Sequence, residues 1–151
     1  HERDEVTQLL LDACSVARDL VLLIGQWAHA HGAVMPPKQG FPNTYTFRMI
    51  AFHYLMIRPA GSLLPAMDIT GPRLREPCHC ASASAPELFK EWLRHLAHAG
   101  SEGRLWADLR NPWDLGPPDE WGVLDPVTGR NLITFRGQQP RVIADLAKEC
   151  L

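Results

Sequence analysis

A continuous apolar stripe runs through the first fifth of the chain. Its positions recur at intervals of three and four, which is the spacing of one face of an α-helix. The stripe predicts a helix over residues 2–31, with Gly32 after its end, since glycine commonly terminates a helix. If this run divides into two helices, we expect the joint at Asp19. The stripe consists of Val6, Leu9, Leu10, Ala13, Val16, Ala17, Leu20, Leu23, Ile24 and Trp27.

A second helix is predicted after a proline-rich loop. Residues 33–43 hold three prolines and a glycine, which is typical of a loop. The apolar run that follows predicts a helix over residues 44–57, and either Asn43 or Thr44 can cap its first turn. The pair Arg58-Pro59 then stops the run.

A third helix carries a capping box. Residues 70–85 are rich in proline and serine and low in hydrophobicity, so we expect a surface loop there. Ser84 can cap the next helix, and Glu87 stands three residues later, as a capping box requires. The helix is expected to end at Gly100. Its predicted buried face consists of Leu88, Phe89, Trp92, Leu93, Leu96 and Ala99.

The last third of the chain predicts two short strands and a closing helix. The segments "RLWADL" and "WGVLDP" are short, apolar and bounded by turn residues. The segment "PRVIADLAKECL" has helical spacing. The pattern therefore predicts a mainly α fold, a single helical domain over residues 1–151 with a small two-stranded element.

Composition and charge limit the classes of partner. With 46% hydrophobic and 21% charged residues, the chain has the composition of an ordinary globular domain. Its longest apolar stretch, "LVLLIGQWA", is too short to span a bilayer, so we expect no membrane partner. The formal net charge of −2 makes DNA an unexpected partner, and RNA would need a local basic patch. The scattered candidates for such a patch are Arg73, Arg75, Arg104, Arg110, Arg130, Arg136 and Arg141.

Of the four cysteines, only Cys78 and Cys80 cluster, with His79 between them. A zinc site needs four ligands, and the chain offers no second pair at a standard spacing. We therefore expect free thiols in an intracellular compartment and no metal site. The chain begins with His1 and not with methionine, which leads us to expect removed upstream residues and favours the mitochondrion.

Five segments, in order, resemble one protein family. The segment "LVLLIGQWAHAHG" is similar to the I-K-x-W-A-K-x-x-G helix of terminal uridylyltransferases and noncanonical poly(A) polymerases. The segment "NTYTFRMIAFHYLM" resembles their S-S-Y-A-L-x-x-M-x-I-x-Y-L-Q. Then "SLLP", "ELFKEWLRHLAH" and "VLDPVTGRNL" follow where the family has V-L-P, E-L-L-x-x-F-x-x-Y and I-E-D-P-F-D-x-x-N-N-V. The resemblance covers nearly the whole chain and implies the helical central domain of these enzymes.

The resemblance implies five nucleotide-binding positions, either real or vestigial. It implies that Tyr45 stacks on a base and that Thr44 keeps a hydroxyl beside the phosphates. Thr7 falls in a pair that contacts ribose and base, and Asp125 and Asn131 match polar residues of the last segment. Each has a simpler interpretation. Tyr45 could be a half-buried helix-start tyrosine, Thr44 an N-cap, Asp125 a turn residue and Asn131 a loop hydrogen bonder. For Thr7 we prefer an exposed helix residue.

The chain also departs from the family at positions that hold the nucleotide. Gly25 and His29 stand where the family has two lysines aimed at the triphosphate, and lysine is a point charge suited to phosphate. Val6 replaces the asparagine beside Thr7, and Leu124 replaces the glutamate before Asp125. These substitutions remove much of the expected attraction for a nucleotide.

The family's catalytic palm has no counterpart in this sequence. The palm carries a Gly-Ser and three carboxylates that hold two Mg²⁺ ions, because two metals clamp the attacking and leaving oxygens. Neither Gly-Ser pair here leads into an Asp-x-Asp, so we expect no catalytic residue and no transfer of nucleotides by this chain alone.

We favour a degenerate, non-catalytic nucleotidyltransferase-like module that acts as a structural component or assembly factor of an RNA–protein complex, with protein partners and no cofactor of its own. The alternative is the observed half of an active RNA 3'-terminal nucleotidyltransferase, using Mg²⁺ with UTP or ATP, whose palm is missing from this chain. A third possibility is an unrelated helical domain with a similar pattern.

Overall fold

The structure is a computed structural model that describes residues 1–78 and 82–151. In these residues five α-helices, one short 3₁₀ helix and two short strands follow one another. They are α1 (Glu2–Ala13), α2 (Ser15–Ala30), η1 (Pro37–Gln39), α3 (Thr44–Ile57), α4 (Ala85–Glu102), β1 (Leu105–Ala107), β2 (Trp121–Val123) and α5 (Gln139–Glu149). The predicted fold class, mainly α with a small two-stranded element, is confirmed.

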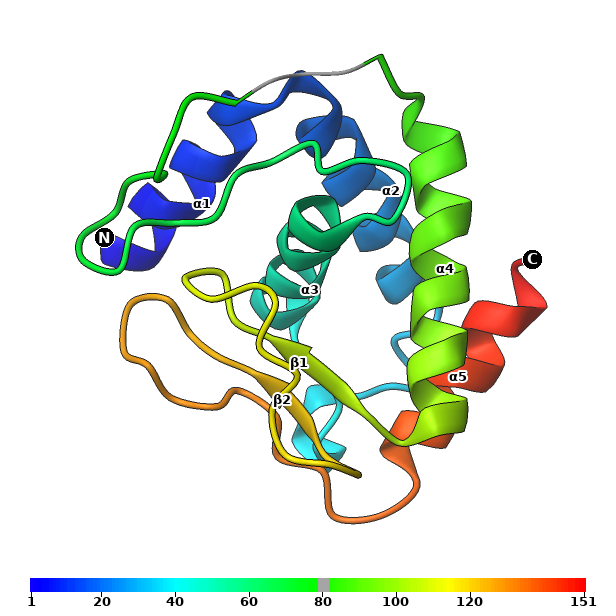
Figure 1. Ribbon diagram of the computed structural model, residues 1–151. Coiled ribbons are helices and arrows are strands. Elements are labelled where there is room, and N and C mark those ends of the chain that lie inside the picture. The colour runs from blue at the N-terminus through cyan, green and yellow to red at the C-terminus, as the bar shows by residue number, and fades with distance from the viewer. Residues whose placement is uncertain (79–81) are drawn as a thin grey trace.

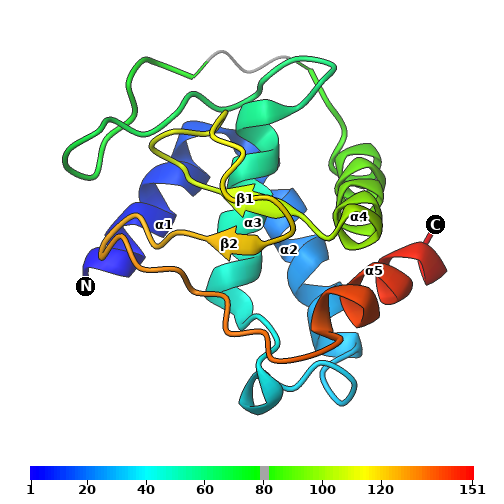
Figure 2. The ribbon, with the colours of Figure 1, turned by 60° about the horizontal axis from the view of Figure 1, so that its bottom comes forward.

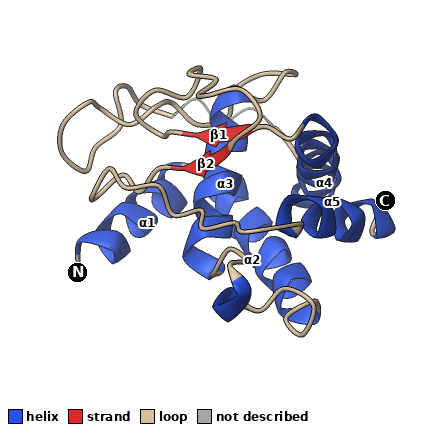
Figure 3. Cartoon of the chain, turned by 90° about the horizontal axis from the view of Figure 1, so that it is seen from below, coloured by secondary structure: helices blue, strands red, loops and turns tan. Residues whose placement is uncertain are grey.

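Helix α3 lies in the middle of the molecule, with α1 on one side and α4 on the other (Figures 1 and 2). Most of its side chains are buried, on every face of the helix: Thr46, Phe47 and the run from Met49 to Met56. A helix that is apolar all round must be surrounded by protein. Helix α2 covers one side of α3, and the strands lie over it in the view from below (Figure 3).

Aromatic rings join the helices at the centre of the core. Trp92 of α4 is fully buried. Its ring meets that of Trp27 on α2 edge-on, with centroids 5.5 Å apart. Trp27 meets Phe47 of α3 in the same way, at 5.8 Å. Edge-to-face pairs of this kind contribute about 0.5–1.5 kcal/mol beyond the area that they bury.

The two strands are parallel, with Leu105 opposite Trp121 and Ala107 opposite Val123. Parallel neighbours need a long connection, of a dozen residues or more, to return the chain to the same end. Here residues 108–120 supply that connection without a helix (the yellow segment in Figure 1). This loop therefore lies beside the sheet and contributes to the surface near α3 and α4.

The joint in the first apolar run lies at Cys14, and our prediction of Asp19 is wrong. Cys14 has an extended backbone (φ −143°, ψ 115°) and is at once the C-cap of α1 and the N-cap of α2. Its side chain is buried in the core, so the break turns the chain without exposing apolar surface. Asp19 lies inside α2 and is exposed. The end of α2 differs only slightly from the prediction, with His31 as its C-cap.

The caps of α3 and α4 follow their sequence signals at the start. Asn43 is the N-cap of α3, and its Oδ1 accepts a hydrogen bond from the Thr46 amide at 2.9 Å. Ser84 caps α4 through the Glu87 amide at 3.2 Å. Before α4, residues 70–78 and 82–84 form no helix or extended strand and are mostly exposed.

The end of α4 differs from the prediction, because Gly100 is not its C-cap. The helix continues to Glu102, and Gly103 caps it with a left-handed backbone (φ 67°). Gly100 lies against α5, where an added Cβ would be 2.1 Å from the Cβ of Ala144. The glycine therefore serves close packing between α4 and α5.

Two Gly→Ala substitutions in helices should have opposite effects. Gly100→Ala should lower the free energy of unfolding by about 1–3 kcal/mol, because the new methyl collides with Ala144. Gly25→Ala meets no atom within 4 Å and should raise it by about 0.5–1 kcal/mol through helix propensity. Urea unfolding measures both. Adding Ala144→Gly to the Gly100→Ala variant should restore part of the lost free energy of unfolding, because it removes the colliding methyl. A Gly100→Ala variant more stable than the native protein would contradict this packing between α4 and α5.

Candidate functional site

Two of the predicted site residues, Tyr45 and Asp125, lie in contact and are joined by Arg3. The Tyr45 hydroxyl donates to Asp125 Oδ1 at 3.0 Å. Arg3 donates to Asp125 Oδ2 through Nε at 3.1 Å and through a terminal nitrogen at 2.7 Å. We call these three residues, together with Thr128, the Asp125 cluster. It links α1, the start of α3 and the turn that follows β2.

The turn after β2 positions the Asp125 carboxylate. Oδ1 accepts from the Val127 amide at 3.0 Å, the pattern by which aspartate stabilises a turn. Oδ2 accepts from the Thr128 hydroxyl at 3.2 Å. The Asp125 backbone pairs with Arg130 and Gly129, at 2.8 Å and 2.7 Å, which closes the turn. The interpretation of Asp125-Pro126 as a turn is therefore confirmed.

The Asp125 carboxylate is saturated with hydrogen bonds. It is 1% exposed and accepts five bonds, two from Arg3 and one each from Tyr45, Val127 and Thr128. A carboxylate has roughly four lone-pair sites, so no acceptor capacity is left for a metal ion, a base or a water to be activated. In this arrangement Asp125 can hold the fold together but cannot act on a ligand.

Burial and hydrogen bonding act in opposite directions on the pKa of Asp125. Burial raises it, but the bonds from Val127, Arg3 and Tyr45 outweigh burial and hold the pKa below its usual value of 3.8. Burial, with the hydrogen bond to Asp125, raises the pKa of Tyr45. At neutral pH the aspartate is therefore ionised and the tyrosine keeps its proton.

Arg3 also covers part of the Tyr45 ring. Its guanidinium carbon lies 4.8 Å from the ring centroid, in the geometry of a cation–π contact. A base that stacked on this face would have to displace Arg3. Arg3 could not be predicted as part of this cluster, because nothing in the sequence connects position 3 with positions 45 and 125.

Thr44 belongs to a different site, a groove between α2 and the start of α3. Thr44 is exposed and shares a hollow of about 230 Å³ with Gly25 and His29. Those two positions also line an adjoining hollow of about 510 Å³, together with Arg48, one turn beyond Thr44. We call both hollows the α2–α3 groove. It gathers the positions that the resemblance assigns to the triphosphate.

Arg48 is a second functional candidate that the sequence pattern did not single out. It lies on α3 and is partly buried. Its Nε is buried and has no hydrogen-bond partner among the described residues. Burying such a donor without a partner costs about 1–3 kcal/mol, more for a charged group. The only signal for Arg48 in the sequence was its position four residues after Thr44 on a predicted helix, which places both side chains on the same face.

The remaining two predicted residues have structural surroundings. Thr7 is buried on α1, so our preference for an exposed residue is wrong. The reason is that Thr7 lies one turn after Arg3, on the face that α1 turns toward the protein. Asn131 is exposed, and its Oδ1 accepts from the amides of Val123 at 3.1 Å and Ile133 at 3.0 Å. It thus acts as a loop hydrogen bonder beside β2.

Four of the seven candidate arginines for RNA are engaged inside the chain. Arg110 donates to the carbonyls of Pro126, Asp68 and Gly71 and so ties two loops together. The other three form one ion pair and several bonds to backbone carbonyls: Arg73 with Asp68, Arg75 with Arg110, and Arg104 with Leu115 and Gly116. Arg130, Arg136 and Arg141 are exposed.

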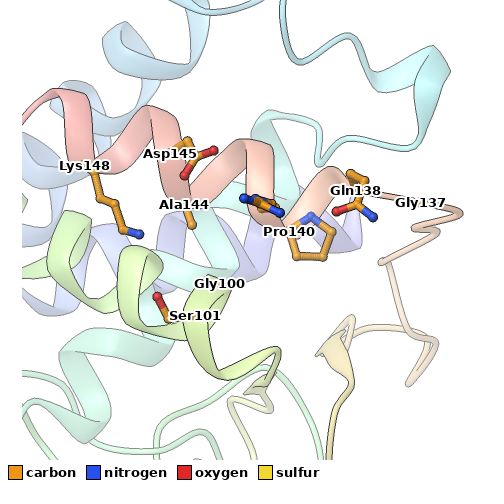
Figure 4. Close-up of a pocket in the computed structure, with 9 residues that line it drawn as sticks. Gly100, Ser101, Gly137, Gln138, Pro140, Ala144, Asp145 and Lys148 are labelled. Atoms are coloured by element: carbon orange, nitrogen blue, oxygen red, sulfur yellow. The ribbon is translucent and has the colours of Figure 1, made fainter.

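The other hollows found in the described residues do not include the five predicted nucleotide-binding residues. A groove of about 530 Å³ lies between α5 and the end of α4, with Ser101 on one side and Ala144, Asp145 and Lys148 on the other (Figure 4).

In residues 1–78 and 82–151, no three histidine, cysteine or acidic side chains are grouped as metal ligands would be. The predicted Cys78–Cys80 cluster falls partly outside the described residues. No helix in the described part is long and apolar enough to cross a membrane.

A scan against models of protein families finds no match, and neither the curated proteins nor the solved structures contain one. The resemblance to terminal uridylyltransferases therefore depends on the sequence segments alone.

The Asp125 cluster should behave as one coupled unit. Asp125→Asn should lower the free energy of unfolding by about 1.5–3 kcal/mol, since bonds to a charged group are lost, and Tyr45→Phe by about 1 kcal/mol. The double variant should lose less than the sum of both, with a coupling of about 0.5–1 kcal/mol in urea unfolding, since the shared bond cannot be worth more than the smaller single effect. Strict additivity would contradict the bond between the two side chains.

Unfolding measurements at low pH provide a control for the comparison of these variants. Because the folded-state pKa of Asp125 is depressed, its contribution is complete at neutral pH and is lost as the pH falls through that pKa. The stability difference between the native protein and Asp125→Asn should therefore narrow below about pH 4. A difference that stayed constant would show that the charge of Asp125 is not what stabilises the cluster.

Proposed function

We propose that this chain is a degenerate, non-catalytic nucleotidyltransferase-like module, a structural component or assembly factor of an RNA–protein complex. One observation carries the proposal. Tyr45 and Asp125, which the resemblance would assign to a nucleotide base, bond to each other and to Arg3. Their polar capacity is used inside the chain, as expected of a site kept for packing.

The α2–α3 groove supports the same proposal through what it lacks. At positions 25 and 29 it presents a glycine and an exposed histidine where the resembling enzymes have lysines. A triphosphate carries several negative charges, and its binding depends on cations held at fixed positions. Without these lysines, the groove's cations are Arg48 and Arg18, and Arg18 is paired with Asp12.

Arg48 favours the alternative, that the chain is the observed half of an active RNA 3'-terminal nucleotidyltransferase with a palm elsewhere. Arg48 lines the α2–α3 groove, and its buried Nε has no hydrogen-bond partner among the residues that the structure describes. A guanidinium can bind phosphate oxygens in a bidentate manner, so Arg48 could replace one lost lysine. Mg²⁺ with UTP or ATP would then belong to the assembled enzyme.

Partners and location complete the proposal. Protein partners within an RNA–protein assembly are expected. RNA contacts would fall to the exposed arginines, Arg130, Arg136 and Arg141, because the others are bonded within the chain. We propose the mitochondrion as the compartment.

A nucleotide titration separates the two functions. In calorimetry with MgUTP and with MgATP, the proposed module should show no binding with a Kd below about 1 mM, because the groove lacks its lysines. Tighter binding that Arg48→Gln weakens about tenfold or more, while Arg130→Gln does not, would establish the alternative. Arg130→Gln is the matched control, since it removes the same charge from an exposed turn outside the groove.

A sedimentation experiment tests the assembly role directly. The full-length protein, tagged in its own cells, should migrate in a density gradient with a particle much larger than itself. Ribonuclease should shift it to lighter fractions, because RNA holds such a particle together. Migration as a free protein, with or without ribonuclease, would contradict the proposed role.

A further inference from the structure

The larger hollow of the α2–α3 groove lies along the exposed side of α2. It has a volume of about 510 Å³, and Leu11 of α1 and Arg48 of α3 line it together with residues of α2. Four of the α2 residues are spaced at three or four and so share one face of the helix. We call them the α2 stripe. It consists of Arg18, Leu22, Gly25 and His29.

Gly25 lies in the interior of α2, and the packing of a single copy does not require it. Its backbone is helical, and a glycine inside a helix lowers the stability of that helix. At Gly100 the missing side chain admits a second helix, α5. The gap over Gly25 is of the same kind, but no other element of the described chain comes within 4 Å of a Cβ placed there.

Leu22 stands one turn before Gly25 and is 61% exposed. A single exposed leucine is ordinary on a protein surface. Leu22 differs because it borders a hollow whose walls also include Leu11 and Val21, so a contact here would bury connected apolar surface. A projecting side chain next to a gap, on one face of a helix, is also what two helices need in order to pack ridges into grooves.

Two charges without partners line the same hollow. Arg48 forms no hydrogen bond or ion pair with a described residue, and of its nitrogens only Nε is buried, so the terminal nitrogens reach the surface. Asp19 is exposed and forms no ion pair within the described chain either. The other cation, Arg18, is paired with Asp12. A guanidinium binds a carboxylate through two parallel bonds, so the hollow offers a carboxylate site and carries a carboxylate of its own.

These features discriminate between possible occupants. RNA is disfavoured, because the carboxylates of Asp12 and Asp19 repel its phosphates. A purely acidic or purely basic segment would satisfy one charge of the hollow and oppose the other. Helix α2 of a second copy has the complement of each feature, with Leu22 for the gap over Gly25 and Asp19 for Arg48. A patch that is complementary to itself is what a two-fold dimer requires.

We propose that two copies of this chain form a two-fold dimer in which α2 of each copy lies in the larger hollow of the other. Leu22 fills the gap over Gly25 of the second copy, and Asp19 pairs with Arg48 of the second copy. The dimer does not rest on the role in an RNA–protein complex proposed above. It is compatible with that role, because a second copy in the hollow closes it to a triphosphate.

Sedimentation equilibrium of the purified chain tests the dimer. The 16.9 kDa protein should have twice that mass at about 100 µM, with a Kd of about 10 µM or tighter. A monomer at about 500 µM would overturn the proposal and would leave the hollow to RNA or to a different protein. Because no RNA or other protein is present, the outcome is separate from that of the density gradient, which tests the role in an RNA–protein complex.

Two apolar variants assign the dimer to the α2 stripe. Gly25→Ala should weaken it about tenfold, because the methyl group occupies the gap that Leu22 of the second copy needs. The same change should stabilise the monomer, so misfolding cannot explain the weaker dimer. Leu22→Ala should also weaken it about tenfold. Ile69→Ala, the matched control, removes a side chain that is 74% exposed in a loop outside the groove and should leave the Kd unchanged. A dimer that neither stripe variant weakens would overturn this interface.

An exchange of charges tests the contact between the copies. Arg48→Glu and Asp19→Arg should each weaken the dimer about tenfold, because each places two like charges opposite one another. The double variant should return to within about threefold of the native Kd, since every pair is then restored with its signs exchanged. Arg48 and Asp19 are not paired within one copy, so such a rescue reports on the second copy. A double variant as weak as the single ones would overturn the proposed pairing.

Discussion

The buried carboxylate of Asp125 is the constraint around which the first and last parts of the chain are arranged. A carboxylate removed from water must be paired and hydrogen-bonded, or the fold is strongly destabilised. Its partners come from α1, from the start of α3 and from its own turn. The Arg3 end of the bond is partly exposed, with 40% of its side chain accessible, so the pair is less desolvated than a fully buried one. The bonds nevertheless fix where α1 begins and where β2 ends relative to α3.

The second constraint is the burial of α3 on all sides. An apolar helix with no polar face needs neighbours around its whole circumference. Helix α2 and the two strands supply part of that cover. Because the strands are parallel, the chain needs the long loop 108–120 to join them. That loop brings Pro112, Trp113 and Leu115 against α3 and α4, where they line a pocket of about 200 Å³ together with His53 and His95.

Much of the fold could be predicted from local pattern, and its failures have physical causes. The range of α3 and the N-caps of α3 and α4 are local, since they depend on residues three or four apart. The sequence predicted the range of α3 and the Ser84 cap of α4, and it named Asn43 as one of two candidates for the cap of α3. The joint at Cys14 could not be found, because a single extended residue leaves the apolar periodicity intact. Gly100 was predicted to be a cap because the sequence does not show whether a glycine allows close contact between helices or adopts a left-handed backbone. Tyr45 and Asp125 were singled out, but their pairing through Arg3 spans more than a hundred residues and no local signal shows it.

The satisfied and unsatisfied polar groups of this chain are distributed unevenly. Asp125 has more hydrogen bonds than lone-pair sites, and Tyr45 is bonded at its hydroxyl and covered by Arg3. In contrast, six buried side-chain nitrogens in the described part of the chain lack a partner, and two of them, Trp27 Nε1 and Trp92 Nε1, lie in the core. A buried group that is already satisfied gains little from a ligand, whereas an unsatisfied one gains the whole cost of its desolvation. Tyr45, the residue to which the resemblance points most directly, therefore gains little from a ligand, because its hydroxyl is already bonded and Arg3 covers its ring.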